Sequence, residues 1–248
     1  SITQGSLASR PEYCYAARVY RWWQETFPLS RITFINAGIG GTTSQFGAAR
    51  VQEDLLNYKP DFVLTEFSVN DENSAHFQET YEGLIRRILK SGTALMLMNN
   101  VCYDTGYSAE EVHLEIARHY LLPSVSMKST IYAALQRGEM ANRDITPDDL
   151  HPNDLGHELV AKGICHLLER IRRAPWEQEP EASLPAPLTY NRYEDSRRHQ
   201  NHNSTPVCSG FVPDGTTQEH ITQMFRHGWT AWKVRWRAPV SVFSTANP

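Results

Sequence analysis

The chain has 248 residues, of which 40% are hydrophobic and 21% charged, and its formal net charge at pH 7 is −4. This composition is typical of a globular protein with enough material for a substantial core in one or two domains. A slightly acidic balance argues against nucleic acid as a partner. No apolar run reaches the length of a membrane span, so we expect no membrane partner either.

The four cysteines are spread along the chain, at Cys14, Cys102, Cys165 and Cys208. None forms a C-x-x-C pair, so we predict no zinc site of that kind and no metal or cofactor. Few and scattered cysteines favour a reducing compartment, which makes the cytoplasm the expected location. No signal peptide is visible, and a chain that opens on Ser1 offers no basis for assigning a targeting segment.

Helical and strand patterns alternate through the first 173 residues. Apolar residues at three- and four-residue steps predict helices at 11–27, 44–57, 77–90, 109–120, 129–136 and 155–171. Runs rich in β-branched, aromatic or other apolar residues predict strands at 32–35, 61–67, 93–98 and 124–126. Because several of these strands are apolar throughout, we predict a parallel sheet covered by helices on both faces. This is a three-layer α/β/α sandwich of the flavodoxin-like type.

The loop Asp148-Asp149-Leu150-His151-Pro152 places an acid three residues before a histidine. A serine nucleophile needs a histidine to take its proton and a carboxylate to orient the imidazole. The loop therefore supplies base and orienter together. In the alternative interpretation, Asp148 and Asp149 are only turn and capping residues and His151 is incidental.

The pattern changes after residue 173. Residues 174–187 contain four prolines and several acids, which predicts an extended linker. Residues 188–248 are expected to form a C-terminal extension or a partial β module. Trp229, Trp232 and Trp236 could present a sugar-binding platform, but such closely spaced tryptophans are more often part of a core, and we favour that interpretation.

Four short blocks follow one another along the chain: Ser1-Ile2-Thr3, the glycine-rich turn 38–44, Asn70-Asp71 and the loop ending at His151. This order resembles that of the SGNH (GDSL-type) hydrolase superfamily, whose members include carbohydrate esterases. The chain resembles this superfamily over roughly residues 1–173, which implies the SGNH-hydrolase variant of the predicted fold.

The resemblance implies a role for each matching residue. Ser1 would be the nucleophile, His151 the general base and Asp148 the orienting acid. The backbone N–H of Gly41 and the side chain of Asn70 would stabilise the oxyanion. The expected function is that of a serine esterase that hydrolyses short acyl esters, such as acetyl groups on carbohydrate, through an acyl-enzyme.

Two other functions remain open at this point. One is a non-catalytic SGNH scaffold with a carbohydrate-binding C-terminal part. The other is an N-terminal-nucleophile hydrolase, in which the α-amine of Ser1 acts as the base. The second would leave Asp148 and His151 without a role.

The chain departs from the superfamily pattern at two places. Ser68 stands where a glycine is usual, and a serine there is expected to narrow or polarise the pocket. The strand that normally precedes the nucleophile is missing, so residues before Ser1 are expected to belong to the protein, or another segment fills the slot. We consider residues 240–243 for that slot, from the same chain or from a second copy in a homo-oligomer with exchanged strands.

Overall fold

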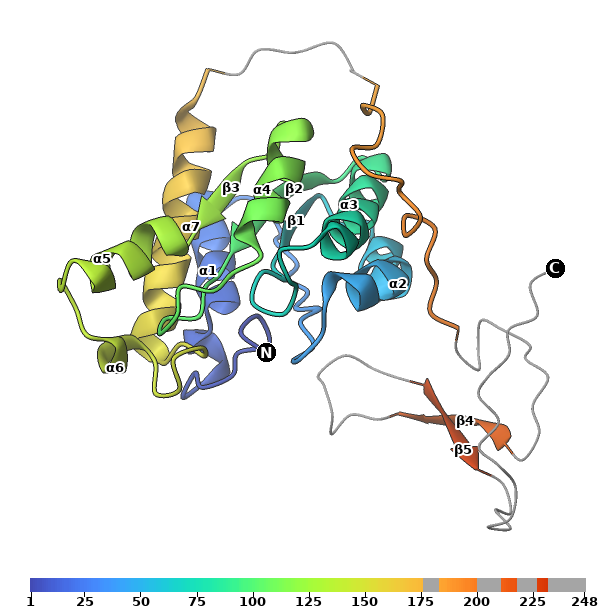
Figure 1. Ribbon diagram of the computed structural model, residues 1–248, viewed down its shortest axis with the longest axis horizontal. Helices are drawn as coiled ribbons and strands as arrows, with labels where there is room; N and C mark the ends of the chain where they lie inside the picture. Colours follow the sequence, from blue (N-terminus) through green and yellow to red (C-terminus); the bar gives the residue numbers. More distant parts are fainter. Residues whose placement is uncertain (176–182, 200–210, 218–226, 232–248) are drawn as a thin grey trace. The chain divides into compact units, whose positions relative to one another are not determined.

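The computed structural model describes residues 1–175, 183–199, 211–217 and 227–231. The chain forms two compact units, Ser1–Arg197 and Arg198–Pro248, and each is described here by itself. The first unit contains a parallel sheet with the strand order β1-β2-β3 (Figure 1). Its strands are β1 (Phe62–Thr65), β2 (Ala94–Asn99) and β3 (Ser124–Ser126).

Helices alternate with these strands. They are α1 (Tyr15–Thr26), α2 (Ser44–Asp54), α3 (Ala75–Lys90), α4 (Glu110–His119), α5 (Ala133–Gln136), α6 (Asn142–Ile145) and α7 (Asp154–Arg173). Short 3₁₀ turns lie at Pro11–Tyr13 and Leu56–Tyr58, and a π-helical turn lies at Lys128–Tyr132. No helix in the described part of the chain is both long and apolar enough to cross a membrane.

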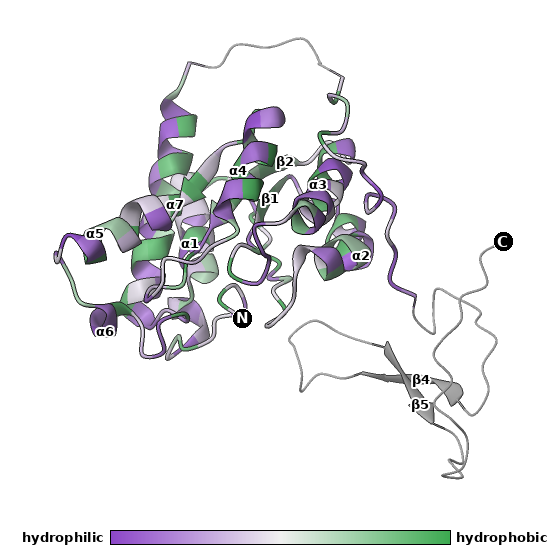
Figure 2. Ribbon diagram, in the orientation of Figure 1, coloured by the Kyte–Doolittle hydropathy of each residue, from purple (hydrophilic) through white to green (hydrophobic). Residues whose placement is uncertain are grey.

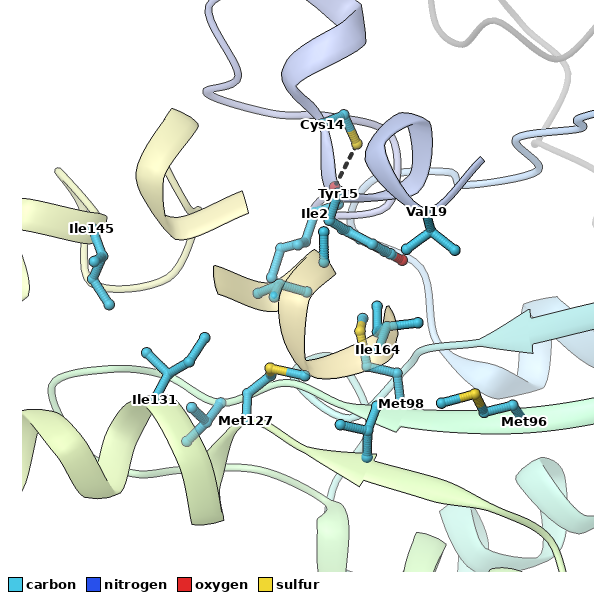
Figure 3. Packing of buried hydrophobic residues seen from close by; sticks show 14 of the residues in the cluster. Ile2, Cys14, Tyr15, Val19, Met96, Met98, Met127, Ile131, Ile145 and Ile164 are labelled. Atoms are coloured by element: carbon cyan, nitrogen blue, oxygen red, sulfur yellow. Dashed lines mark hydrogen bonds between the residues drawn. The ribbon is translucent and has the colours of Figure 1, made fainter. Parts of the chain in front are cut away.

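The central strand β2 sends its side chains alternately to the two faces of the sheet, as strand geometry requires. Met96 and Met98 pack with residues of α1 and α7, as Figure 3 shows. Leu95 and Leu97 pack with residues of α2, α3 and α4 in a second cluster. Helices therefore cover both faces, which confirms the predicted α/β class with a parallel sheet.

Helix α7 begins directly after the loop that carries His151. The side chain of Asn153 caps it by accepting the N–H of Gly156 at 3.0 Å. Gly156 packs so closely against the backbone of Ile145 that a Cβ would overlap it. Val160, Ile164 and Leu168 are among the buried residues of α7, and Figure 2 shows its hydrophobic and hydrophilic sides. Burial of each such side chain contributes about 1.5–3 kcal/mol, which anchors the loop.

The predicted strand at 32–35 is not formed. This segment has an irregular backbone, and together with β1 it lines a cavity of about 740 Å³. A strand needs a hydrogen-bonded neighbour, and within the described ranges β1 pairs only with β2. The segment at 32–35 therefore has no strand beside it. The expectation that residues 240–243 fill this slot concerns residues outside the described ranges.

The first unit extends past residue 173, where the sequence predicts the hydrolase domain to end. Residues 183–197, which we call the α3 strap, contact α3 through buried charges. Glu82 accepts the backbone N–H groups of Leu188 and Thr189, and Arg86 Nε lies 2.9 Å from Glu194 Oε2. The domain boundaries at residues 173 and 187 stay predictions.

The described part of the second unit is an antiparallel pair of strands, β4 (Phe211–Thr217) and β5 (His227–Ala231), with a register shift between Asp214 and Thr217. Two strands in this region fit the predicted partly β character of the extension. Trp232 and Trp236, of the predicted aromatic group, lie outside the described ranges.

Candidate active site

The loop that carries Asp148 and His151 is held by its own side chains. Asp148 Oδ1 accepts the backbone N–H groups of Leu150 and His151, at 3.1 and 2.7 Å. Asp149, which directly follows Asp148, has a left-handed backbone with φ of 66°. The hydroxyl of Thr146 donates to the carbonyl of His151 at 2.9 Å. These local bonds fold a short turn that presents the carboxylate of Asp148 to the imidazole of His151.

The structure brings Ser1, His151 and Asp148 into one hydrogen-bonded chain. Ser1 Oγ lies 2.7 Å from His151 Nε2, and His151 Nδ1 lies 2.7 Å from Asp148 Oδ2. In the tautomer with the hydrogen on Nδ1, Nε2 is free to accept the proton of the serine hydroxyl. Ile2, buried at 1% exposure among residues of α1 and α7, anchors Ser1 (Figure 3).

Asp148 is held as a carboxylate. Burial by itself would raise its pKa, but hydrogen bonds from the ring of His151 and from the backbone of His151 and Leu150 lower that pKa to about 2. A carboxylate ionised at all ordinary pH values can stabilise the positive charge that His151 acquires when it takes a proton.

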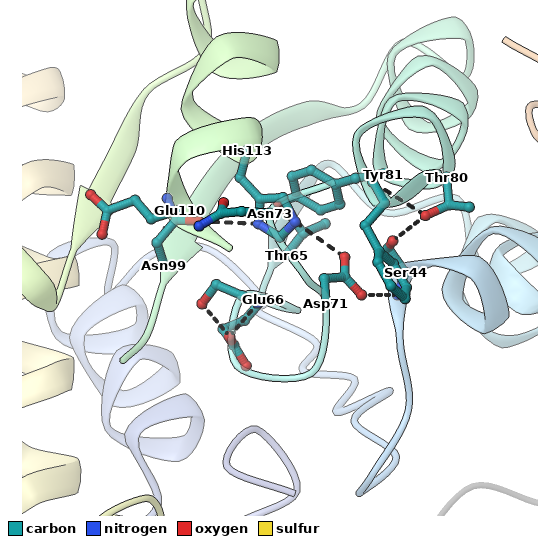
Figure 4. Close-up of polar contacts among 12 residues, drawn as sticks. Ser44, Thr65, Glu66, Asp71, Asn73, Thr80, Tyr81, Asn99, Glu110 and His113 are labelled. Carbon is teal, nitrogen blue, oxygen red and sulfur yellow. Dashed lines mark hydrogen bonds and ion pairs between the residues drawn. The ribbon is translucent and has the colours of Figure 1, made fainter. Parts of the chain in front are cut away.

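Asn70 lies on the loop after β1 and lines the same cavity as Ser1. Its backbone N–H and that of Asp71 bond to the carbonyl of Phe67, at 3.0 and 2.9 Å. Asp71 is fully buried, and its carboxylate contacts the N–H of Ser44 at 2.8 Å and His113 Nε2 at 3.1 Å (Figure 4). The loop is therefore fixed from two helices, α2 and α4.

Gly40 is the glycine of the glycine-rich turn that lies against Ser1. A Cβ at Gly40 would lie 3.3 Å from the Cα and Cβ of Ser1, so a larger residue would press on it. The Gly40 N–H donates to Gln4 Oε1 at 3.0 Å. Gly41 has φ of 67°, a conformation that favours glycine. Its N–H has no hydrogen-bond partner among the described residues, which leaves it available to a substrate. Its role stays a prediction.

Ser68 is not among the residues that line the cavity, so it does not narrow the pocket as one half of the expectation has it. Whether it polarises the pocket stays a prediction. It has 0% exposure, and its hydroxyl lies 2.9 Å from Glu66 Oε1 and 2.7 Å from the N–H of Asn100. The hydroxyl thus joins the carboxyl ends of β1 and β2. Sequence reasoning missed this role because Asn100 is 32 residues away.

Glu66 is a residue of the site that the sequence analysis did not single out. It lines the cavity with Ser1, and its burial raises the pKa of its carboxyl. Oε1 also accepts the backbone N–H of Ser68 at 2.9 Å. The signal available in the sequence was an acidic residue near the end of the mostly apolar strand predicted at 61–67. Within the described residues, no group of His, Cys, Asp and Glu side chains could hold a metal ion.

His157, which the sequence assigns to the start of the last helix, has a structural position. It is fully buried, its Nδ1 accepts the N–H of Tyr15 at 3.3 Å, and its Nε2 lies 3.1 Å from the carbonyl of Ser6. These contacts join α7 to α1 and to the turn after Ser1.

Known proteins with similar sequences and structures agree with the α/β fold. The profile of the GDSL-like Lipase/Acylhydrolase family matches residues 1–159. Two crystal structures of a two-domain esterase active on acetylated mannans, one with mannopentaose, are 56% identical to this chain, with TM-scores of 0.86 and 0.87. These matches cover 94% of this chain but 62% and 63% of the esterase chains, so this chain spans less than two thirds of their length.

A more distant likeness concerns the fold alone. A catalytic mutant of an acetylxylan esterase from Geobacillus stearothermophilus is 19% identical, with a TM-score of 0.58, over 68% of this chain and 90% of that chain. No curated protein matches the chain. The family profile covers well over half of the sequence, and it confirms the resemblance drawn from the four short blocks. The chain belongs to the GDSL-like lipase/acylhydrolase family.

Proposed function

We propose that the protein is a serine esterase that removes short acyl groups, acetyl groups above all, from carbohydrate. The observation that carries the proposal is the chain of two 2.7 Å contacts from Ser1 Oγ through His151 to Asp148. The substrate class is supported by the esterase active on acetylated mannans, which is 56% identical to this chain.

In the proposed reaction, Ser1 Oγ attacks the ester carbonyl carbon while its proton passes to His151 Nε2. The tetrahedral intermediate then breaks its bond to the sugar oxygen, which leaves with the proton from His151. Water attacks the resulting acyl-serine and gives a proton to His151. The second tetrahedral intermediate then breaks its bond to Ser1 Oγ, which takes that proton back from His151 as the acid is released. Asp148 keeps the imidazole oriented and stabilises its positive charge at both stages.

The negative charge of the intermediate falls on the former carbonyl oxygen. We assign its stabilisation to the side-chain amide of Asn70 and the backbone N–H of Gly41. A preorganised donor of this kind is worth about 3 kcal/mol in a transition state. The hydrogen bond from the Ser44 N–H to the carboxylate of Asp71, at 2.8 Å, helps to hold the loop that carries Asn70.

The two alternatives from the sequence find less support. A non-catalytic scaffold gives no reason for a serine, a histidine and an aspartate to meet in hydrogen-bond geometry. A mechanism with the α-amine as base leaves the 2.7 Å contact between Ser1 Oγ and His151 Nε2 unused.

Hydrolysis of p-nitrophenyl acetate and of O-acetylated mannopentaose tests the proposal. We expect wild-type protein to hydrolyse both esters and His151→Ala to lose at least about 10³-fold in kcat. His166→Ala is the matched control, because His166 is an exposed histidine on α7 and should leave kcat unchanged. A His151→Ala variant within about threefold of wild type would exclude His151 as the base.

A further inference from the structure

The loop between β2 and α4 touches both loops that carry the proposed catalytic residues. The N–H of Tyr103 donates to the carbonyl of Asp149 at 2.7 Å, two residues before His151. The N–H of Ala109 donates to the carbonyl of Ser68 at 2.7 Å, two residues before Asn70. Residues 101–109, which we call the rim loop, therefore run along one side of the site.

The rim loop is closed on itself. The N–H of Gly106 bonds to the carbonyl of Cys102 at 2.8 Å, and the N–H of Cys102 bonds to the carbonyl of Tyr107 at 2.9 Å. Gly106 has φ of 71°, and a Cβ there would lie 2.8 Å from the ring of Tyr132. The loop is thus a preformed support, and a side chain mounted on it is held in place before any ligand arrives.

Tyr107 is the large side chain that this loop presents to solvent, with 41% exposure. Its hydroxyl donates to the carbonyl of Asp71 at 2.9 Å, beside Asn70. This hydrogen bond holds one end of the ring next to Asn70, the proposed oxyanion donor, while part of the ring stays exposed. A fixed aromatic face with negative charge density suits the C–H face of a sugar ring.

The surroundings of Tyr107 are acidic. Glu72 and Asp104 are exposed. Glu72 directly follows Asn70 and Asp71, and Asp104 lies on the rim loop three residues before Tyr107. Burial raises the pKa of the Tyr107 phenol, and the charges of Glu72, Cys102 and Asp71 add to this rise. Carboxylates at such a rim accept hydrogen bonds from hydroxyl groups and repel anionic substrates.

We infer that Tyr107, with Glu72 and Asp104, forms a subsite for a neutral sugar ring of the acylated carbohydrate. The ring stacks on Tyr107 and its hydroxyls donate to the two carboxylates. This subsite rests on the proposed esterase function, because it places the sugar that carries the scissile ester beside Asn70. The subsite favours neutral polysaccharides over polysaccharides that contain uronic acids.

Two substitutions at Tyr107 separate stacking from anchoring. Tyr107→Phe and Tyr107→Leu both lose the bond to Asp71, but only phenylalanine keeps an aromatic face. We expect Tyr107→Leu to lower the ratio of kcat/KM for O-acetylated mannopentaose to kcat/KM for p-nitrophenyl acetate by about tenfold, while Tyr107→Phe keeps the ratio within about twofold. Tyr190→Ala, which removes an exposed tyrosine on the α3 strap, is the control and should leave the ratio unchanged.

The acidic pair is tested with a charged ester. The double variant Glu72→Gln, Asp104→Asn should raise the ratio of kcat/KM for an acetylated oligogalacturonate to kcat/KM for p-nitrophenyl acetate several-fold. The small ester serves as the internal reference, because its own kcat/KM should not change.

The two Tyr107 variants also provide the outcome that would overturn the stacking role. If Tyr107→Leu and Tyr107→Phe give equal ratios, the aromatic ring makes no difference.

Binding of unmodified mannopentaose, measured by calorimetry, tests the subsite without catalysis. We expect wild type to bind it and Tyr107→Leu to bind it about tenfold more weakly. A wild-type protein that hydrolyses neither ester but still binds mannopentaose through Tyr107 would refute the proposed function and keep the subsite. If the wild type hydrolyses both esters, but wild type and Tyr107→Leu bind mannopentaose with equal affinity, the subsite is refuted and the proposed function stands.

Discussion

At the scale of single residues, Asn70 shows how a loop holds the residue that we propose as an oxyanion donor. It lies between buried Ser68 and buried Asp71, and it lines the cavity that Ser1 also lines. We expect Asn70→Ala to lower kcat by about 10²-fold to 10³-fold with little change in KM, because a donor to the oxyanion acts in the transition state.

Turnover of p-nitrophenyl acetate, measured at saturating and at limiting substrate concentrations, gives kcat and KM for this variant. Asn57→Ala, at an exposed asparagine in the turn after α2, serves as the control. A loss confined to KM would instead place Asn70 in ground-state binding.

We expect the Ser68 hydroxyl to stabilise the folded protein as well as to join the ends of β1 and β2. Its hydroxyl is the partner of the Asn100 N–H at 2.7 Å, in a fully buried environment. Ser68→Ala leaves that donor without a partner, so we expect a loss of about 1–3 kcal/mol in the free energy of unfolding. Urea denaturation measures it, with exposed Ser129→Ala as the control. If both variants unfold at the same urea concentration, the hydroxyl does not join the two strands.

What could be predicted at this scale depends on how local the signal is. Asp148 and His151 lie three residues apart, so their contact follows from one turn, and the resemblance to a family supplied Ser1 and Asn70. The role of Ser68 could not be predicted, since its partner Asn100 comes from the end of another strand. Gly40, rather than its neighbour Gly41, makes the close approach to Ser1, and two adjacent glycines cannot be told apart by sequence.

At the scale of elements, helix α3 presents acidic and basic residues that look like a solvated face in the sequence. In the structure this face is covered by the α3 strap, whose partners are more than 90 residues away in the chain. Glu79, Glu82 and Arg86 are buried there. Periodicity predicted α3 well, but no local pattern shows which segment covers it, and the strap was predicted in part as a linker.

The charges of the strap predict how its docking depends on pH. Burial opposes the ionisation of Glu194, but hydrogen bonds from Lys90, Asn191 and Arg86 lower its pKa from the ordinary 4.5 to about 2. A carboxyl with a lowered pKa in the folded state stabilises the fold above its ordinary pKa, and this stabilisation is lost as pH falls from 4.5 towards 2.

We therefore expect Glu194→Gln to lower the Tm at pH 7 and to lose most of that difference by pH 3. Thermal unfolding followed by circular dichroism at both pH values measures it. Glu12→Gln, at an exposed acid in the first 3₁₀ turn, controls for a general effect of charge. A difference of equal size at pH 7 and pH 3 would show that the pairing of Glu194 does not hold the strap.

At the scale of the whole chain, the sheet is where the sequence and the structure differ most. Three of the four predicted strands form, and they pair in parallel between two layers of helices. The remaining predicted strand, at 32–35, has strand-forming residues but no neighbouring strand in the described part of the chain. Local propensity therefore does not suffice, because a strand depends on its hydrogen-bond partner.

The cavity of about 740 Å³ beside β1 predicts where the fold opens most easily. Strand β2 is paired on both sides and β1 on one side in the described ranges, so backbone amides of β1 should open at lower free energy. We expect hydrogen exchange, followed by mass spectrometry, to be faster in Phe62–Thr65 and in residues 32–35 than in Ala94–Asn99. Equal protection of both strands would contradict this and would mean that another strand occupies the slot, as the hypothesis for residues 240–243 requires. Protection that disappears on dilution would assign that strand to a second copy of the chain, since exchange of a strand between protomers depends on concentration.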